Sequence, residues 1–176
     1  SLLFRPQHRA AFADTRVGTD WAGRPRTRKS TNGGALMLGR HCIKSWATTQ
    51  AVIALSSGEA EFYGVVKGAS SLLGLIFLAA DLGIELKGRI DTDSTAARGI
   101  CNCRGLGKTR HIQTQYLWVQ ERLQAGDFQS FKVPGKENPG DLMTKHLDAA
   151  TIDKWAHKLG MEFPHSASKL HLRAES

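Results

Sequence analysis

The chain has 176 residues, of which 41% are hydrophobic, so its composition favours one folded domain with a sizeable core over a disordered chain. Lysines and arginines number 24 against 16 acids, and the formal net charge is +8. This excess favours a polyanionic partner such as nucleic acid, although it could also serve only solubility. Cys42, Cys101 and Cys103 are odd in number and poorly spaced for disulfides or a zinc site, so we expect free thiols in an intracellular, reducing setting.

Two features bear on targeting. The longest apolar run, near residues 71–80, is too short to cross a bilayer, and we expect no membrane partner. No signal peptide is visible, and the chain does not begin with methionine. We therefore expect a piece of a longer product or of a partial gene.

The first half of the chain contains extended segments followed by one long helix. Residues 1–16 have no sustained periodicity and are predicted to be an irregular lead-in, ahead of a strand that begins near Val17. Further extended segments are predicted at 35–38, 43–48 and 51–55, with a basic turn at 24–34. Apolar residues recur at helical spacing from Phe62 to Phe77, with Ser56 or Ser57 as N-cap and Gly83 as the stop.

Strands and helices alternate in the second half. We predict a strand at 88–92, a short helix capped by Ser94, a helix at 111–125 closed by Gly126, and a strand at 128–133. Asp141 is predicted to cap the next element, and a further helix is predicted at 151–159. The expected fold is α/β, with a mixed five-stranded sheet of three antiparallel strands and then two parallel strands, and with helices on both faces. The expected divisions are a domain at 17–147, a C-terminal helix at 148–163 and a tail at 164–176.

Acidic residues stand where predicted strands end or helices begin, namely Asp20, Glu59, Glu61, Asp93 and Asp141. In a mixed sheet such positions gather on one edge, where carboxylates repel one another unless cations neutralise them. Magnesium suits a set of oxygen ligands. Each acid also has a simpler explanation as a turn residue, a helix cap or a partner of the helix dipole, so spacing alone gives only a weak indication of a metal site.

Several strings, in chain order, resemble the ribonuclease H domain of copia-type retrotransposon Pol polyproteins. These strings are DWAGRPRTRKSTNGGALMLG, IKSW, ALSSGEAEFYG, TDSTAARGI, KTRHIQTQYLWVQE and KVPGKENPGDLMTKHL. The resemblance runs from about Val17 to Leu147. It implies a ribonuclease H-like fold and a hydrolase that uses two Mg²⁺ ions, or Mn²⁺, to cleave RNA in RNA–DNA hybrids endonucleolytically.

The resemblance also assigns the site residue by residue. Glu61, Asp93 and Asp141 correspond to three catalytic, metal-binding carboxylates, whereas Glu59 is the less suitable acid of the EAE string. The family's first carboxylate falls on Gly18, and Asp20 matches a second, usually non-catalytic, acid. Asp20 is kept as a weaker catalytic candidate, because positions 18 and 20 share a strand face. Two residues span roughly 6.6 Å, however, which is too far for the same coordination.

Basic residues supply the expected nucleic-acid contacts. They are Arg24, Arg26, Arg28 and Lys29 in the basic turn, and Arg104, Lys108 and Arg110 in a second patch. Such side chains neutralise phosphates without reading sequence, although a solvated hairpin would carry the same charges. His111 is expected in helix packing or phosphate contact. Trp21 and Trp46 are expected in the core rather than as stacking surfaces.

Three functional interpretations remain open at this point. The first is a metal-dependent hybrid endoribonuclease that is impaired by Gly18, joined to the reverse transcriptase of its polyprotein in a cytoplasmic virus-like particle or the nucleus. The second is a catalytically dead domain of the same fold that binds hybrid or other nucleic acid. The third is a decayed retroelement fragment. Gly18 favours the second and third, whereas intact Glu61, Asp93 and Asp141 favour the first.

Overall fold

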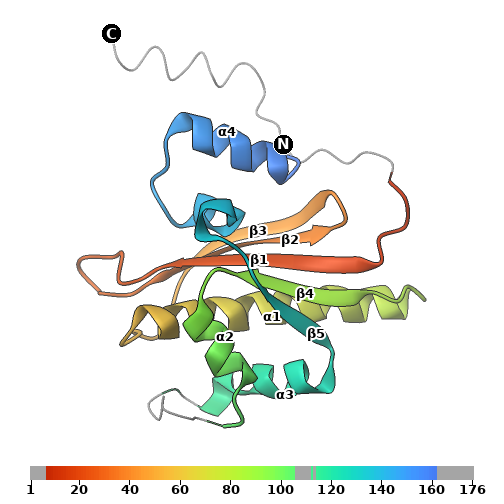
Figure 1. Ribbon diagram of the computed structural model, residues 1–176, viewed down its shortest axis with the longest axis horizontal. Coiled ribbons are helices and arrows are strands. Elements are labelled where there is room, and N and C mark those ends of the chain that lie inside the picture. The colour runs from red at the N-terminus through yellow and green to blue at the C-terminus, as the bar shows by residue number, and fades with distance from the viewer. Residues whose placement is uncertain (1–6, 106–111, 113, 162–176) are drawn as a thin grey trace.

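A single sheet organises the chain. The structure is a computed structural model that describes residues 7–105, 112 and 114–161. Five strands form the sheet in the order β3-β2-β1-β4-β5, and helices cover both of its faces (Figure 1).

The strands run as the sequence predicts. Strands β1 (Phe12–Asp20), β2 (Thr31–Leu38) and β3 (His41–Thr49) are antiparallel neighbours, whereas β4 (Lys87–Thr92) and β5 (Phe128–Lys132) run parallel to β1. Hairpin connections at 21–30 and 39–40 allow the antiparallel pairs, and the helices between the later strands supply the crossovers that parallel pairing needs. The predicted ribonuclease H-like fold class is confirmed.

The predicted lead-in at 1–16 is wrong over residues 12–16, because β1 begins at Phe12. Ala13 and Thr15 are fully buried on one face of this strand. The alternating residues Asp14 and Arg16 carry charges, so the segment lacks the sustained apolar pattern of a predicted strand. On the other face of the sheet, Asp14 pairs with Arg89 at 3.4 Å and Arg16 pairs with Asp91 at 3.9 Å, both partners belonging to the adjacent strand β4.

Two further strand predictions are corrected. Strand β2 starts at residue 31, inside the predicted turn. The glycines that suggested a turn instead allow neighbouring side chains to pack closely on the strand, since a Cβ on Gly34 would lie 2.3 Å from the Trp46 ring. Residues 51–55 form bends rather than a strand. Ile53 and Leu55 are exposed there, and no sheet edge pairs with them.

Helix α1 (Ser57–Asp81) is the core helix of one face of the sheet. The Ser56 side chain accepts a hydrogen bond from the Glu59 amide, and Gly83 adopts a φ of +71°, as expected for the cap and the stop. By length and composition alone α1 could cross a membrane, which corrects the estimate from the shorter apolar run. Its buried face, however, packs on the sheet around Phe62 and Leu72.

The remaining helices are short: α2 (Thr95–Asn102), η1 (Thr114–Tyr116), α3 (Trp118–Ala125), η2 (Gly135–Glu137), η3 (Pro139–Met143) and α4 (Ala149–Lys158). The caps predicted at Ser94 and Gly126 are confirmed. The helix predicted at 111–125 is shorter in the structure, where the α-helix begins only at Trp118. Residue 111 itself lies outside the described residues. Asn138, rather than Asp141, caps η3.

One buried side chain ties η3 to the centre of the sheet. Asn138 is fully buried, and its Nδ2 donates to the Val17 carbonyl at 2.7 Å while its Oδ1 accepts from the Gly140 amide at 3.0 Å. The contact joins residues 121 positions apart in the chain. It brings Gly140 so close that a Cβ there would lie 2.6 Å from the Gly18 amide nitrogen. The position of η3 therefore depends on Asn138 and on two glycines.

Replacing Asn138 by alanine should lower the free energy of unfolding by about 2–3 kcal/mol, because two hydrogen bonds are lost and the buried Val17 carbonyl is left without its partner. Urea unfolding followed by circular dichroism measures this loss. Asn102→Ala is the matched control, since the Asn102 amide also donates to a carbonyl but is exposed. Equal effects of the two substitutions would contradict the importance of the buried contact.

Candidate functional site

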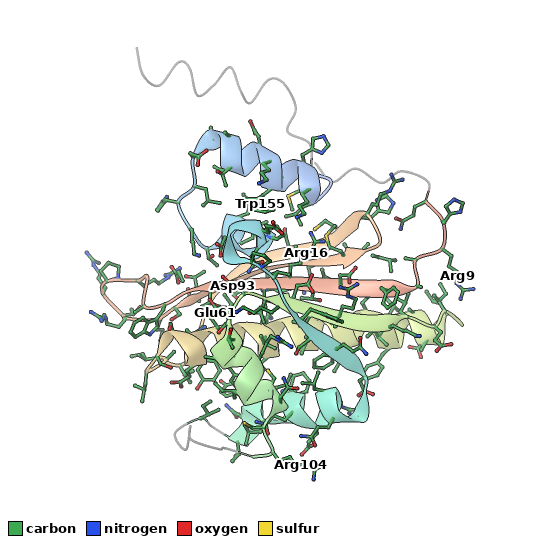
Figure 2. The ribbon with its side chains drawn as sticks, in the orientation of Figure 1. Arg9, Arg16, Glu61, Asp93, Arg104 and Trp155 are labelled. Atoms are coloured by element: carbon green, nitrogen blue, oxygen red, sulfur yellow. The ribbon has the colours of Figure 1, made fainter. Side chains whose placement is uncertain are left out.

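Three carboxylates come together where β4 ends. Glu61 lies in the second turn of α1, Asp93 directly follows β4, and Asp141 lies in η3, which Asn138 holds against β1. Figure 2 shows Glu61 and Asp93 next to each other between α1 and the sheet. The three acids thus come from one helix, one strand end and one 3₁₀ helix that are distant in sequence.

The carboxylates interact electrostatically. Burial, together with the charges of Asp93 and Asp141, raises the pKa of Glu61 to about 8 against the opposing effect of Lys145. Burial also raises the pKa of Asp141, to which Asp93 adds. Glu61 Oε2 is buried and lacks a hydrogen-bond partner within the described structure. The site is therefore short of positive charge.

Lys145 is the positively charged side chain that lies next to these three acids. Its Nζ lies 2.8 Å from Asp141 Oδ2. Burial lowers the pKa of Lys145, but the hydrogen bond to Asp141 and the charges of Asp141, Asp93 and Glu61 together raise it above its ordinary value. The backbone holds it there, since the Lys145 and Thr144 amides both donate to the Asp141 carbonyl, at 3.0 and 3.1 Å. Sequence reasoning did not single out Lys145. The available signal was its spacing of four residues from Asp141 in GDLMTK.

Gly18 borders the same site from β1. A Cβ on Gly18 would lie 3.0 Å from Asp141 Oδ1 and 3.1 Å from the Gly140 carbonyl carbon. A side chain at position 18 would thus start beside the carboxylates, which is where the resemblance places the family's first aspartate. The backbone of Gly18 is ordinary strand, so an aspartate requires only that η3 shift by a few tenths of an ångström.

The other candidate acids have structural contacts. Asp20 Oδ1 accepts a hydrogen bond of 2.5 Å from the Thr31 amide and so closes the β1–β2 hairpin. Glu59 is buried, and its two oxygens accept from the Leu55 amide and the Tyr63 hydroxyl. Neither acid is among the charges that act on Glu61. The structure therefore brings Glu61, Asp93 and Asp141 together and leaves Asp20 at the end of β1, bonded to Thr31.

The three side chains are of the type that binds magnesium, but their positions in this structure do not form a magnesium site. Glu61, Asp93 and Asp141 present only oxygen donors, which Mg²⁺ prefers. Among the described residues, however, no three Asp, Glu, His or Cys side chains form a set that could hold a metal ion. Asp141 is already paired with Lys145, and position 18 offers no ligand. As it stands, the site does not fit the two ions that the resemblance implies.

The basic hairpin is exposed at the end of the molecule where α1 begins (Figure 1). Arg24, Arg26 and Arg28 are exposed and Lys29 is half-buried. Backbone hydrogen bonds from the Arg24 amide to Lys29 and from the Arg28 amide to Arg24 give the turn a defined shape. Arg104, also exposed, lies beyond α3 on the far side of α1 (Figure 2), while Lys108 and Arg110 lie outside the described residues.

The prediction of a core role is confirmed for Trp46 and wrong for Trp21. Trp46 is 7% exposed, whereas Trp21 is 54% exposed. The Trp21 indole donates to the Ala54 carbonyl at 3.3 Å, which fixes the ring beside the exposed Ile53 and Leu55. Trp21 follows directly on β1, where the chain has already left the sheet, so its ring reaches the surface next to the basic hairpin.

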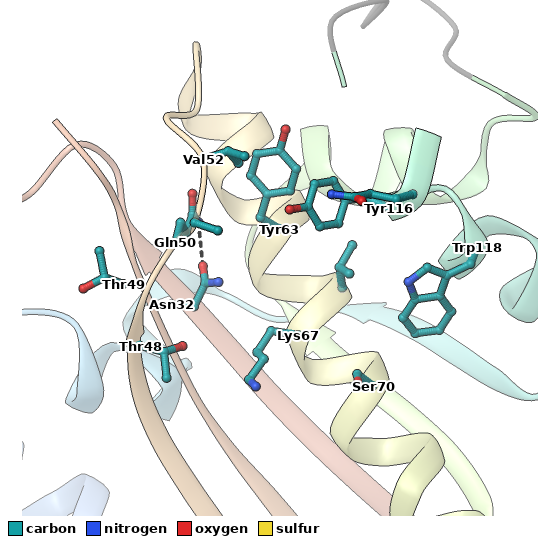
Figure 3. Close-up of a pocket in the computed structure, with 13 residues that line it drawn as sticks. Asn32, Thr48, Thr49, Gln50, Val52, Tyr63, Lys67, Ser70, Tyr116 and Trp118 are labelled. Carbon is teal, nitrogen blue, oxygen red and sulfur yellow. Dashed lines mark hydrogen bonds between the residues drawn. The ribbon is translucent and has the colours of Figure 1, made fainter. Parts of the chain in front are cut away.

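A separate pocket that the sequence did not indicate lies between β3, α1 and η1. Figure 3 shows Tyr63, Tyr116 and Trp118 on one side, with Gln50 hydrogen-bonded to Asn32 on the other. Its volume is about 490 Å³, and the Tyr63 and Tyr116 rings meet edge to face at 4.9 Å. It is lined by none of the three carboxylates and is therefore a different feature of the surface.

Comparisons with known proteins agree with the geometry. No protein-family profile matches the chain. It is 30% identical over 145 residues to the retrovirus-related Pol polyprotein from transposon RE2 of Arabidopsis thaliana, and 28% identical over 144 residues to that from transposon TNT 1-94 of Nicotiana tabacum. Each alignment covers 81% of this chain. The chain spans about a tenth of the length of these curated relatives, 10% and 11% respectively.

Solved structures with a similar shape include two ribonuclease H or reverse transcriptase proteins. One is the N-terminal RNase H domain of rv2228c from Mycobacterium tuberculosis, with a TM-score of 0.46, 15% identity, and coverage of 84% of this chain and 98% of that one. The other is the prototype foamy virus protease-reverse transcriptase, with a TM-score of 0.46, 13% identity, and coverage of 91% and 22%.

The raised pKa of Glu61 predicts a stability that falls as pH rises. Below the ordinary value of 4.5 the group is protonated in both folded and unfolded chains. Between 4.5 and about 8 only the unfolded chain releases the proton, so the free energy of unfolding decreases with pH, and above about 8 the decrease is complete. After allowance for partial solvent exposure, the loss should be ~3 kcal/mol or less.

Urea unfolding at pH values from 5 to 9 measures this dependence. Glu61→Gln should flatten the curve and stabilise the chain at pH 9, because the amide carries no charge. Glu121→Gln, on the exposed face of α3, is the matched control and should leave the curve unchanged. An unaltered pH curve for Glu61→Gln would show that Glu61 is not held in this environment.

Proposed function

This chain belongs to the retrovirus-related Pol polyproteins of transposons, as their ribonuclease H domain, and on that premise we propose that it binds RNA–DNA hybrids through a site built to hydrolyse the RNA strand. The observation that carries the proposal is the convergence of Glu61, Asp93 and Asp141 beside Gly18. These are the positions that the copia-type resemblance assigns to catalysis. Acids that only cap helices would be expected to contact their own helix, whereas Asp93 and Asp141 act on Glu61 from other elements.

The proposed cleavage is impaired in this chain. Hydrolysis by the family requires Mg²⁺ or Mn²⁺ held by four carboxylates, and only three are present. Position 18 is the vacant one, and Asp20 is too distant and already bonded to the Thr31 amide. We therefore expect the present chain to bind its substrate but to cleave it poorly.

The basic hairpin and Trp21 support nucleic acid as the partner. Exposed arginines at 24, 26 and 28 can neutralise phosphates, and hybrid identity would be recognised through groove shape and 2′-hydroxyls. The adjacent exposed Trp21 ring, held by Ala54, offers a flat apolar surface to a base or sugar. In the intact polyprotein we expect reverse transcriptase as the neighbouring domain, in a cytoplasmic virus-like particle or the nucleus.

A second candidate function is a nucleic-acid-binding module without catalysis. Two observations favour it, namely the missing carboxylate at Gly18 and the pairing of Asp141 with Lys145. The two functions share the binding surface and differ in the chemistry at position 18. Experiments on binding and on cleavage therefore test them separately.

Binding of a hybrid should weaken steeply with salt, because each neutralised phosphate releases counterions. Replacing both Arg26 and Arg28 by alanine should reduce the slope of log affinity against log salt concentration by about 1–2. Fluorescence anisotropy with a labelled hybrid between 50 and 300 mM salt measures the slope. Arg122→Ala is the matched control, because Arg122 is exposed on α3 and pairs with Asp127. Loss of affinity without a change in slope would contradict phosphate contact by the hairpin.

Gly18→Asp should restore cleavage of the RNA strand. The Cβ of the new side chain would lie 3.0 Å from Asp141 Oδ1, and its carboxylate would complete the expected set of four. We expect a gain of three decades or more in rate, with each decade equal to ~1.4 kcal/mol. Cleavage of a labelled hybrid with magnesium, resolved on a denaturing gel, measures the rate.

Gly18→Asn is the control, because it has nearly the same shape as aspartate but no charge, and it should stay inactive. Asp93→Asn in the Gly18→Asp background should abolish the gain. If the unaltered chain already cleaves at a normal rate and Asp20→Asn stops it, the assignment of the first carboxylate to position 18 is wrong. If Gly18→Asp folds and binds hybrid without cleaving, the chain is a binding module.

A further inference from the structure

A lysine occupies the place where the fold leads one to expect a metal. Lys145 Nζ lies 2.8 Å from Asp141 Oδ2, on the side of the site that also faces Glu61 and Asp93. Within the described part of the chain, Lys145 is the cationic side chain that acts on Glu61. A single ammonium group thus faces three acidic side chains.

The backbone makes this placement specific. The turn from Asp141 to Lys145 is closed by two amides that donate to the Asp141 carbonyl, and the Thr144 hydroxyl donates to the same oxygen at 3.5 Å. The turn directs Lys145 back over the carboxylate four residues earlier.

We propose that Lys145 is the internal cation of this site, and that a divalent metal binds only when Lys145 gives up Asp141. The inference rests on the site in the proposed function but not on its cleavage activity. An ammonium group and a metal ion compete for the same carboxylate oxygens, because both lower the repulsion among the acids. Lys145 would therefore limit metal affinity in the present chain and, with Gly18, keep the site inactive.

Lys145 and a carboxylate at position 18 change the charge of the site in opposite directions. The ammonium group offsets negative charge beside Glu61, Asp93 and Asp141, whereas an aspartate at position 18 would add to it. Removing the ammonium has the same electrostatic direction as adding the carboxylate. Lys145→Met and Gly18→Asp should thus each strengthen metal binding, and the double variant should bind most tightly.

Titration of the full chain with Mn²⁺ tests the inference without any nucleic acid. Calorimetry, with the electron paramagnetic resonance signal of free Mn²⁺ as a second readout, gives the dissociation constant. Lys145→Met should lower it tenfold or more, which corresponds to ~1.4 kcal/mol. Lys145→Arg, which retains the charge, should stay near the unaltered chain, and Lys44→Met, on the exposed face of β3, should have no effect.

A second measurement uses the unaltered chain and so does not depend on how any variant folds. Acetylation of Lys145 Nζ by acetic anhydride, followed by peptide mass spectrometry, should quicken severalfold when Mn²⁺ is added, since the displaced ammonium becomes accessible. Lys44 provides the internal reference. An affinity for Mn²⁺ that is unchanged within twofold in Lys145→Met, or an acetylation rate indifferent to Mn²⁺ at saturation, would overturn the inference. The proposed hybrid binding would stand in either case, because it is measured separately.

Discussion

Repulsion among carboxylates is the constraint on which this site depends. Glu61, Asp93 and Asp141 are carried to one place by α1, β4 and η3, and partial burial makes their charges costly. Other contacts hold η3 in this position. The Asn138 side chain bonds to the Val17 carbonyl, and glycines permit the close approach of η3 to β1. A nearby cation lowers this repulsion, and the Lys145 ammonium group offsets part of the negative charge.

The same glycine has two consequences at once. Gly18 lets η3 lie against β1, and it also removes a ligand from the site that η3 completes. A carboxylate there would face Asp141 at close range, so its presence without a metal would raise the repulsion further. The missing acid and the paired lysine are therefore two parts of one electrostatic balance, which lessens repulsion in the metal-free chain and leaves fewer unpaired carboxylates to hold a metal.

The face of the sheet that points away from α1 also carries paired charges between β1 and β4. Asp14 and Asp91 pair with Arg89 and Arg16 across neighbouring strands, and the Arg89 guanidinium lies 4.5 Å from the centre of the Phe131 ring. Cross-strand pairs of opposite sign stabilise a sheet locally. Here each acid has its own cation, whereas at the site three acids share one. Unequal pairing, rather than the number of acids, distinguishes the site from the rest of the molecule.

Much of the fold followed from local patterns in the sequence. The helical period of α1, its Ser56 cap, the β4 and β5 strands and the closing Gly126 depend on neighbours within a few residues, so the sequence alone determined them. Through the family resemblance, the sequence also predicted Glu61, Asp93 and Asp141 as one set. Only the tertiary structure decided that β1 begins at Phe12, because its charged residues form ion pairs with β4. It alone decided that Trp21 is exposed and that Lys145 turns onto Asp141. Each of these depends on partners or packing that no local window contains, since a side chain's environment is set by whichever distant segment folds against it.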